Sequence, residues 1–165
     1  MLLLLLACGP ATEPSDRPTP SDDSTPTSTP TDVPSDVLPW DDDPCVGVTA
    51  QNDWSAQLDR WEAQGRPSGT KLVTGSSSMR RWEHARRDLA AWGPVQRGLG
   101  GAWLSDLAVS VGRLAGPETE SVLVFAGTND LAGGSTVDQV VDRYRCFVEN
   151  VFDVVGPVPV VFVGI

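Results

Sequence analysis

The stretch KLVTGSSSMRRW, residues 71–82, joins a short apolar run to a glycine, three serines and a segment of helical character. Lys71–Thr74 has the composition of a buried strand. A strand that passes through glycine directly into a helix is the unit from which parallel α/β sheets are built. The stretch therefore predicts a strand at 71–74 and a serine loop, Gly75–Ser78, at the carboxyl end of that strand.

The remainder of the folded part repeats this alternation. The runs at 121–126 and 157–164 are apolar almost throughout, as are strands buried on both faces. Thr136 and Gln139 form a predicted capping box for the last helix. We therefore expect an α/β fold, a three-layer α/β/α sandwich around a mainly parallel sheet. The predicted strands are 71–74, 95–97, 121–126 and 157–164, and the predicted helices are 52–64, 79–92, 103–114 and 137–152.

Three loops follow predicted strands and should meet at one edge of the sheet, because ligand sites in such sheets lie at the carboxyl ends of the strands. In Gly75–Ser78 a serine could attack a carbonyl, although serines after glycine also cap helices. Gly98–Gly101 could present backbone N–H groups to a ligand, or it could be a tight turn. Asn129 could direct its amide at a developing negative charge, or it could form a loop turn with Asp130.

Together and in this order, the three loops resemble the SGNH (GDSL-like) hydrolases. The resemblance covers most of residues 50–165 and includes FxGSSSxxxW-like, RGxGG and xxAGxNDL segments, with GSSS, as in one bacterial subgroup, in place of GDS. It implies a flavodoxin-like sheet and a serine esterase or lipase-type hydrolase that cleaves carboxylic esters through an acyl-enzyme. By this resemblance Ser77 is the nucleophile. Its own N–H, with Gly101 and Asn129, would form the oxyanion hole.

Two departures from the family pattern change little, because neither position supplies chemistry. Ser76 stands where the wider family has aspartate, and Gln96 stands where an asparagine often precedes the glycine loop. A third departure concerns the base, which in the family is a histidine preceded three residues earlier by an aspartate, near the end of the domain. The sequence holds one histidine, His84, on the same predicted helix as Ser77. Roughly 10 Å along that helix separates the two residues, too far for a hydrogen bond of about 2.6–3.2 Å.

We therefore predict that His84 is a solvated helix residue, that the sequence stops short of the Asp-x-x-His block, and that the 165 residues alone are inactive. The alternative is a lipid-anchored module that binds a ligand such as a glycan without turning it over. No cofactor and no metal site are predicted. The expected substrate is a small-molecule, polysaccharide or lipid ester, with envelope or extracellular O-acyl and O-acetyl groups favoured.

The N-terminal part has the composition of an export signal and a tether. Residues 1–8 resemble a lipobox that ends in Cys8, which would be lipidated, although an ordinary secretion signal also fits. Residues 9–44 hold nine of the fourteen prolines, nine acidic residues and one arginine, so we predict a disordered tether followed by a partial hydrolase domain at 45–165. The predicted location is the bacterial cell envelope, or outside the cell, with the lipid anchor as the only membrane contact.

Two further cysteines and the distribution of charge also bear on location and partners. Cys45 and Cys146 could pair in an oxidising compartment or remain two buried thiols. Of the net charge of −10, the tether's nine acids and single arginine account for −8, so the folded part is nearly neutral. No basic stripe is present, and nucleic-acid binding is not expected.

Overall fold

The computed structural model describes residues 43–65 and 70–164. The predicted lipobox segment 1–8, including Cys8, lies outside the described residues, as does the predicted tether 9–44 apart from its last two positions. Within the described residues, no helix combines the length and the apolar character needed to cross a bilayer.

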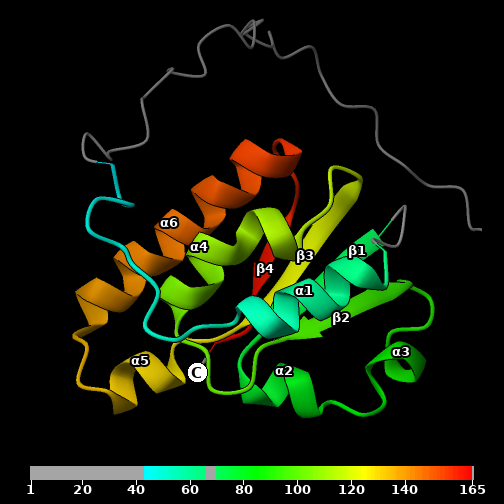
Figure 1. Ribbon diagram of the computed structural model, residues 1–165, viewed down its shortest axis with the longest axis horizontal. Helices are drawn as coiled ribbons and strands as arrows, with labels where there is room; N and C mark the ends of the chain where they lie inside the picture. Colours follow the sequence, from blue (N-terminus) through cyan, green and yellow to red (C-terminus); the bar gives the residue numbers. More distant parts are fainter. Residues whose placement is uncertain (1–42, 66–69, 165) are drawn as a thin grey trace, which may run out of the picture. The chain divides into compact units, whose positions relative to one another are not determined.

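Helices and strands alternate along the described part of the chain, and the four strands form one sheet in the order β2-β1-β3-β4. All neighbouring strands run parallel. The predicted α/β architecture with a mainly parallel sheet is therefore confirmed (Figure 1). The elements are α1 (Ser55–Ala63), β1 (Thr70–Gly75), α2 (Ser77–Arg81), α3 (Ala85–Asp88), β2 (Pro94–Gly98), α4 (Leu104–Leu114), β3 (Thr119–Phe125), α5 (Thr128–Ala132), α6 (Val137–Val155) and β4 (Val160–Phe162).

The strand register sets the level at which the three loops begin. The last residue of β1, Gly75, pairs with Gly98, the last residue of β2. On its other side Gly75 pairs with Phe125, the last residue of β3. Three parallel strands thus end side by side, and the loops that follow them leave the sheet at the same edge, as the sequence predicts.

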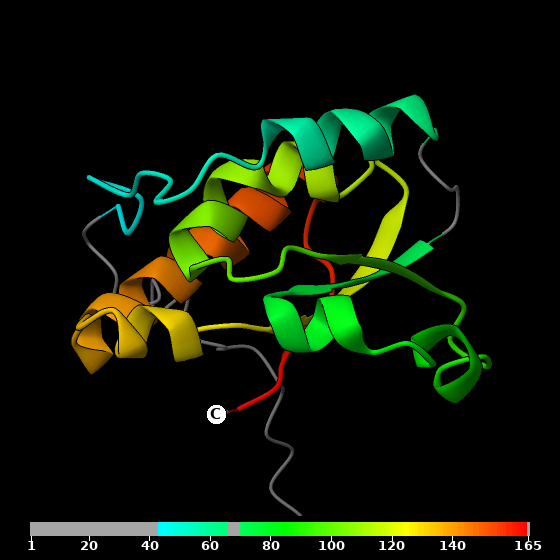
Figure 2. The same ribbon diagram turned by 60° about the horizontal axis from the view of Figure 1, so that its bottom comes forward.

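The helices form a layer on each face of the sheet (Figures 1 and 2). α4 and α6 pack against each other on one face, with α1 against α4, while α2 and α3 pack on the other face. Arg113 of α4 holds α1 in place, because it pairs with Asp59 and, at 2.8 Å between Nε and Oε1, with Glu62.

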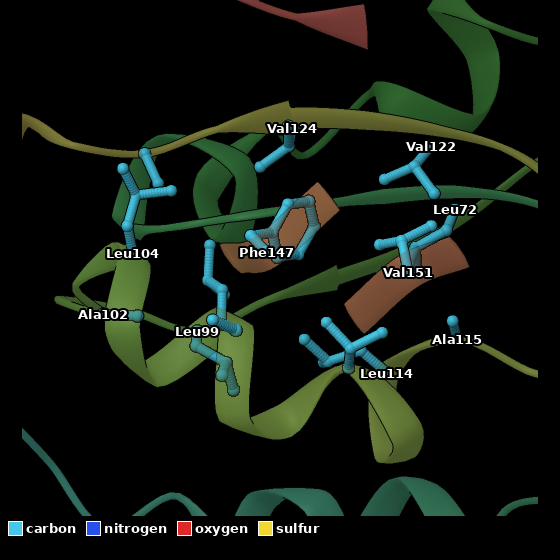
Figure 3. Close-up of a cluster of buried hydrophobic side chains, with 14 of the residues drawn as sticks. Leu72, Leu99, Ala102, Leu104, Leu114, Ala115, Val122, Val124, Phe147 and Val151 are labelled. Carbon is cyan, nitrogen blue, oxygen red and sulfur yellow. The ribbon is translucent and has the colours of Figure 1, made fainter. Parts of the chain in front are cut away.

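The main hydrophobic core lies between the sheet and the pair α4 and α6. Figure 3 shows Val122 and Val124 of β3 directed toward Phe147 and Val151 of α6. The Phe147 side chain is completely buried. Since burial of such side chains is the dominant favourable term in folding, this layer fixes α4 and α6, and with them the loops at the sheet edge.

The helix predicted over 79–92 is two short helices, α2 and α3, with a break at Trp82. The reason is a contact distant in sequence. Gln96, from β2, donates its side-chain amide to the carbonyls of Met79 and, at 3.0 Å, Trp82, and so caps the end of α2. The Trp82 indole N–H then donates to Asp88 at 2.9 Å and closes the turn onto α3. The prediction of one continuous helix was therefore wrong.

Other boundaries differ in smaller ways. α1 begins at Ser55 and not at residue 52, because the Asn52 side chain bonds to Asp106 at 2.8 Å and Asp53 accepts the N–H of Ser55 at 2.9 Å. β4 covers only Val160–Phe162 of the run expected at 157–164.

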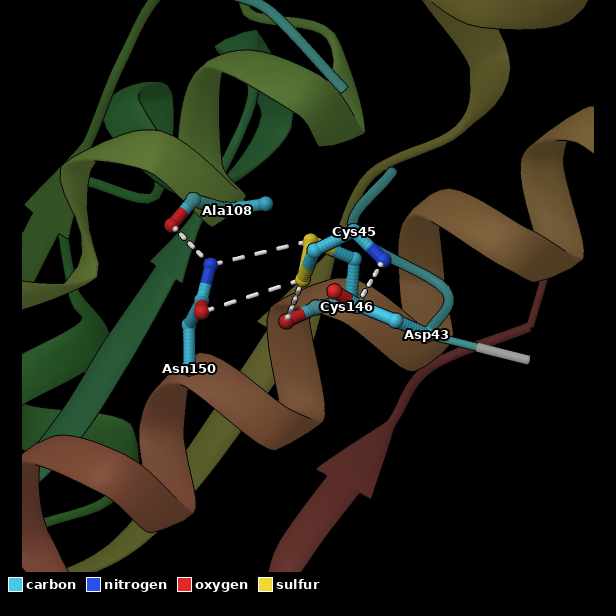
Figure 4. The surroundings of a disulfide bond; sticks show 5 residues. All are labelled: Asp43, Cys45, Ala108, Cys146 and Asn150. Carbon is cyan, nitrogen blue, oxygen red and sulfur yellow. Dashed lines mark hydrogen bonds between the residues drawn. A yellow bond between two sulfur atoms is a disulfide. The ribbon is translucent and has the colours of Figure 1, made fainter. Parts of the chain in front are cut away.

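A covalent link fastens the segment that precedes α1 (Figure 4). Cys45 and Cys146 form a disulfide with a Cα–Cα distance of 4.8 Å, the first of the two alternatives that the sequence leaves open. Asn150, one turn further along α6, donates to the carbonyl of Ala108 in α4 at 3.0 Å. The disulfide thereby joins the start of the domain to the helix pair that covers the core.

Candidate active site

The turn after β1 is bonded to both neighbouring loops. The Ser76 N–H donates to the carbonyl of Phe125 at 3.0 Å, and the Leu99 N–H donates to the carbonyl of Gly75 at 2.8 Å. Gly75 has a φ of 140°, and a Cβ there would lie 2.0 Å from the Phe125 oxygen. Only glycine fits this position, so the turn into α2 has a fixed geometry.

The three serines occupy different environments. Ser76 is 1% exposed and occupies the N-cap position, yet its side chain makes no capping hydrogen bond. Ser77 is half-buried at the first residue of α2 and lines a cleft. Ser78 is exposed. The alternative that the serines merely cap the helix is thus unsupported for Ser76, and Ser77 is the serine that faces the cleft.

The glycine loop lies against α2. A Cβ at Gly98 would lie 2.3 Å from the Arg80 backbone nitrogen, so this glycine permits α2 to rest on the end of β2. Gly101 has a φ of 97°, with no atom within 4 Å of an added Cβ, and it lines the same cleft as Ser77. The left-handed conformation of Gly101 turns the chain toward α4 and requires glycine there for conformational reasons.

Asn129 and Asp130 lie on the short helix α5, which the sequence does not predict, and both bond to the loop that holds Gly101. Asn129 Nδ2 donates to the carbonyl of Ala102 at 2.8 Å. Asp130 is completely buried and accepts the Leu104 N–H at 3.0 Å and the Arg143 guanidinium at 2.9 Å. These bonds give Asp130 a structural role. Asn129 uses one amide hydrogen in this way and keeps a second one.

The cleft has a volume of about 630 Å³ and is open to solvent. Of the predicted site residues it brings Ser77 and Gly101 together, whereas Asn129 is bonded to the loop at Ala102 and is not among the lining residues. Three charged residues, Arg80, Arg81 and Glu83, also line the cleft and were not predicted from the sequence. They follow Ser77 by three to six positions, which places them within one to two helical turns of it. The lining residues are Ser77, Arg80, Arg81, Glu83, Gly100 and Gly101.

Asp106 fixes the start of α4 just beyond the glycine loop. Its carboxylate is fully buried and accepts the backbone N–H groups of Gln51 at 2.6 Å, Asn52 at 2.9 Å and Trp103 at 2.9 Å. Burial alone raises the pKa of Asp106, but these bonds and the Asn52 side chain outweigh it, and the pKa lies below its ordinary value of 3.8. The carboxylate is therefore ionised at neutral pH and ties the segment before α1 to the site.

His84 does not lie on the helix of Ser77, because α2 ends at Arg81. It occupies the N-cap position of α3, is exposed as expected, and does not line the cleft. The prediction that both residues share one helix was wrong. A cluster of Asp43, Cys45 and Glu149 has the ligand types of a metal site, but Cys45 is in a disulfide and offers no thiolate.

Solved structures of several bacterial proteins have the same fold. The chain aligns with a structure described as a platelet activating factor from Streptococcus pneumonia at a TM-score of 0.52 and 15% identity, over 59% of this chain and 46% of the other. It aligns with an acylhydrolase from Bacteroides fragilis at 0.51 and 24% identity, over 68% and 58%. It aligns with a GDSL-like lipase from Bacteroides thetaiotaomicron at 0.51 and 19% identity, over 65% and 57%.

These alignments confirm the fold expected from the three loops, which is that of the SGNH (GDSL-like) hydrolases. The chain spans about half the length of the solved structures that it matches. No protein-family model and no curated protein matches the sequence.

Proposed function

We propose that this chain is the nucleophile-bearing part of a serine ester hydrolase that cleaves carboxylic esters through an acyl-enzyme. The proposal rests on one observation: Ser77 and Gly101 line the same cleft, at the edge of the sheet where β1 and β2 both end. Asn129 supports it, because its amide is bonded to the same loop and retains a second hydrogen.

In the proposed reaction Ser77 Oγ attacks the ester carbonyl carbon and gives its proton to a base. The negative charge then forms on the carbonyl oxygen, where the Ser77 and Gly101 N–H groups and the Asn129 amide stabilise it. The ester C–O bond breaks, the alcohol leaves with the proton, and water releases the acid by the same steps. We place the base in a segment beyond the 165 residues, in line with the partial coverage of the similar structures.

The substrates we propose are O-acyl or O-acetyl groups of envelope or extracellular molecules, and the protein would be held at the envelope through Cys8. The disulfide between Cys45 and Cys146 supports an exported location, because such bonds persist in oxidising compartments. The alternative, a module that binds a glycan without cleaving it, is favoured by the exposed position of His84, which leaves the cleft without a histidine among the described residues.

Hydrolysis of 4-nitrophenyl acetate tests the proposal when it is measured on a protein that includes the segment with the proposed base, because the 165 residues alone are expected to be inactive. Ser77→Ala should reduce kcat/KM by at least about 10³-fold, because a nucleophile has no substitute. Ser78→Ala is the matched control, since this neighbouring hydroxyl is exposed and should leave the rate unchanged. A fluorophosphonate should label Ser77 alone in an intact-mass and peptide analysis. Equal rates for Ser77→Ala and the parent would place the nucleophile elsewhere, and no turnover at all would favour the binding module.

A further inference from the structure

Two cations in the cleft have no part in the proposed bond cleavage. Arg80 and Arg81 follow Ser77 by three and four residues on α2, and residues at this spacing lie on one face of a helix. Both side chains are exposed and line the cleft. Within the described residues neither guanidinium has an ion pair or a hydrogen bond. The two positive charges are therefore available to a ligand.

Arg80 lies over the glycine loop. A Cβ added to Gly100 would be 2.6 Å from Arg80 Nη1 and 2.9 Å from its Cδ, so the absence of a side chain at Gly100 provides the space for this arginine. The next residue is Gly101, the proposed oxyanion donor. An anionic group bound by Arg80 would thus be close to the ester carbonyl that Ser77 attacks.

Two arginines outside the cleft, Arg113 and Arg143, already have partners. Arg113 pairs with Glu62 at 2.8 Å, and Arg143 pairs with the buried Asp130 at 2.9 Å. Glu83 also lines the Ser77 cleft and reduces its charge, but the two arginines outnumber it. The cleft therefore has a net positive charge beside the nucleophile, although the folded part as a whole is slightly acidic.

We propose that the Ser77 cleft selects esters that carry a carboxylate or phosphate near the scissile bond, and that Arg80 and Arg81 bind this anion. The planar fork of N–H donors on a guanidinium fits the two oxygens of either group. The anion keeps its bonds during the reaction, so the arginines act on specificity and not on bond cleavage. The inference rests on the proposed esterase function and adds the substrate class.

The test compares the hydrolysis of matched esters by the protein that includes the segment with the proposed base. On the acyl side, mono-4-nitrophenyl glutarate is compared with its methyl ester. On the alcohol side, an O-acetylated methyl glucuronide is compared with the corresponding glucoside. We expect kcat/KM to favour the anionic member of at least one pair by about tenfold, the size of a charge-assisted hydrogen bond. The pair that shows the preference tells which side of the ester carries the charge.

Variants assign the preference to the arginines. Arg80→Gln and Arg81→Gln should each lower this preference, the ratio of the two kcat/KM values, about three- to tenfold. Arg86→Gln removes an equally exposed charge from α3 outside the cleft and should leave it unchanged. In Gly100→Ala the arginine keeps its charge, but the added methyl group occupies the space of the Arg80 side chain. The preference should therefore fall as it does in Arg80→Gln. Added salt should weaken it.

The outcomes separate this inference from the proposed function. Equal rates within both ester pairs, or a preference that survives Arg80→Gln and Arg81→Gln, would overturn the inference while the esterase proposal stands. If no ester is hydrolysed, calorimetric binding of the same esters to Ser77→Ala measures the preference without turnover. If the anionic member binds more tightly and Arg80→Gln abolishes this difference, the result would support the inference without the esterase proposal. Equal binding of the two members would overturn the inference.

Discussion

The contact between α2 and the end of β2 makes a strong prediction for Gly98→Ala. The added Cβ would lie 2.3 Å from the Arg80 nitrogen, 2.7 Å from its Cα and 2.8 Å from the Met79 carbonyl carbon, whereas ordinary contacts begin at 3.4 Å. These atoms are backbone, so no side chain can rotate away. α2 must move by roughly 1 Å, and overpacking of this kind costs about 1–3 kcal/mol.

The same shift moves Ser77 relative to Gly101, and a displacement of about 1 Å can reduce a rate roughly 10²-fold. Urea unfolding followed by tryptophan fluorescence measures the first effect, and kcat/KM for 4-nitrophenyl acetate measures the second. Gly112→Ala is the matched control, because a Cβ there meets only Val154, at 4.0 Å, in the interior of α4. It should stabilise by about 0.5–1 kcal/mol. Gly98→Ala with unchanged stability and rate would refute the contact between α2 and β2.

Three further predictions concern polar and covalent links near the site. Asp130→Ala removes the carboxylate that pairs with Arg143 and leaves the Leu104 N–H without its acceptor, and it should cost about 3–5 kcal/mol in urea unfolding. Leu131→Ala, at an exposed position, should cost less than about 1 kcal/mol. Because the pKa of Asp106 is lowered in the folded state, its contribution is complete above its ordinary pKa of 3.8 and is lost as the pH falls below that value. Between pH 6 and pH 3 the free energy of unfolding should therefore fall less in Asp106→Asn than in the parent protein. Identical pH profiles of the two proteins would contradict this. Replacing both Cys45 and Cys146 with serine opens a link across 101 residues and should remove about 2–5 kcal/mol of stability, measured as a lower urea midpoint.

The parts of the fold predicted from sequence are those that local patterns determine. The apolar run at 121–126 is β3, because a strand buried on both faces has few alternatives. The capping box is also present, since Gln139 N–H donates to Thr136 Oγ1 at 3.3 Å and Thr136 N–H donates to Gln139 Oε1 at 2.9 Å. The common edge of the three loops followed from strand direction alone. The strand and the capping box depend on residues that are neighbours in the sequence, and the common edge needs only the parallel direction of the strands.

The errors arise where a distant side chain decides local structure. No pattern within 79–92 predicts the break at Trp82, because the cap comes from Gln96 on a different strand. The position of Arg80 depends on the space at Gly100, twenty residues later in the chain. The bond from Asn129 to Ala102 depends likewise on the β1–β3 register. Sequence spacing identified the residue types of the site, and long-range packing determined which of them line the cleft.

The loop that carries Gly101 is held at three points by hydrogen bonds. Leu99 N–H bonds to Gly75, the Ala102 carbonyl accepts from Asn129, and Leu104 N–H bonds to Asp130. Donors fixed in this way need no reorganisation when negative charge develops, which is the condition for large electrostatic stabilisation of a transition state. In the proposed hydrolase Asn129 would have two separable functions: one amide hydrogen positions the loop, and the other would stabilise the oxyanion. On that proposal the loops at the edge of the sheet hold the oxyanion donors in place, and a base would need only to reach Ser77.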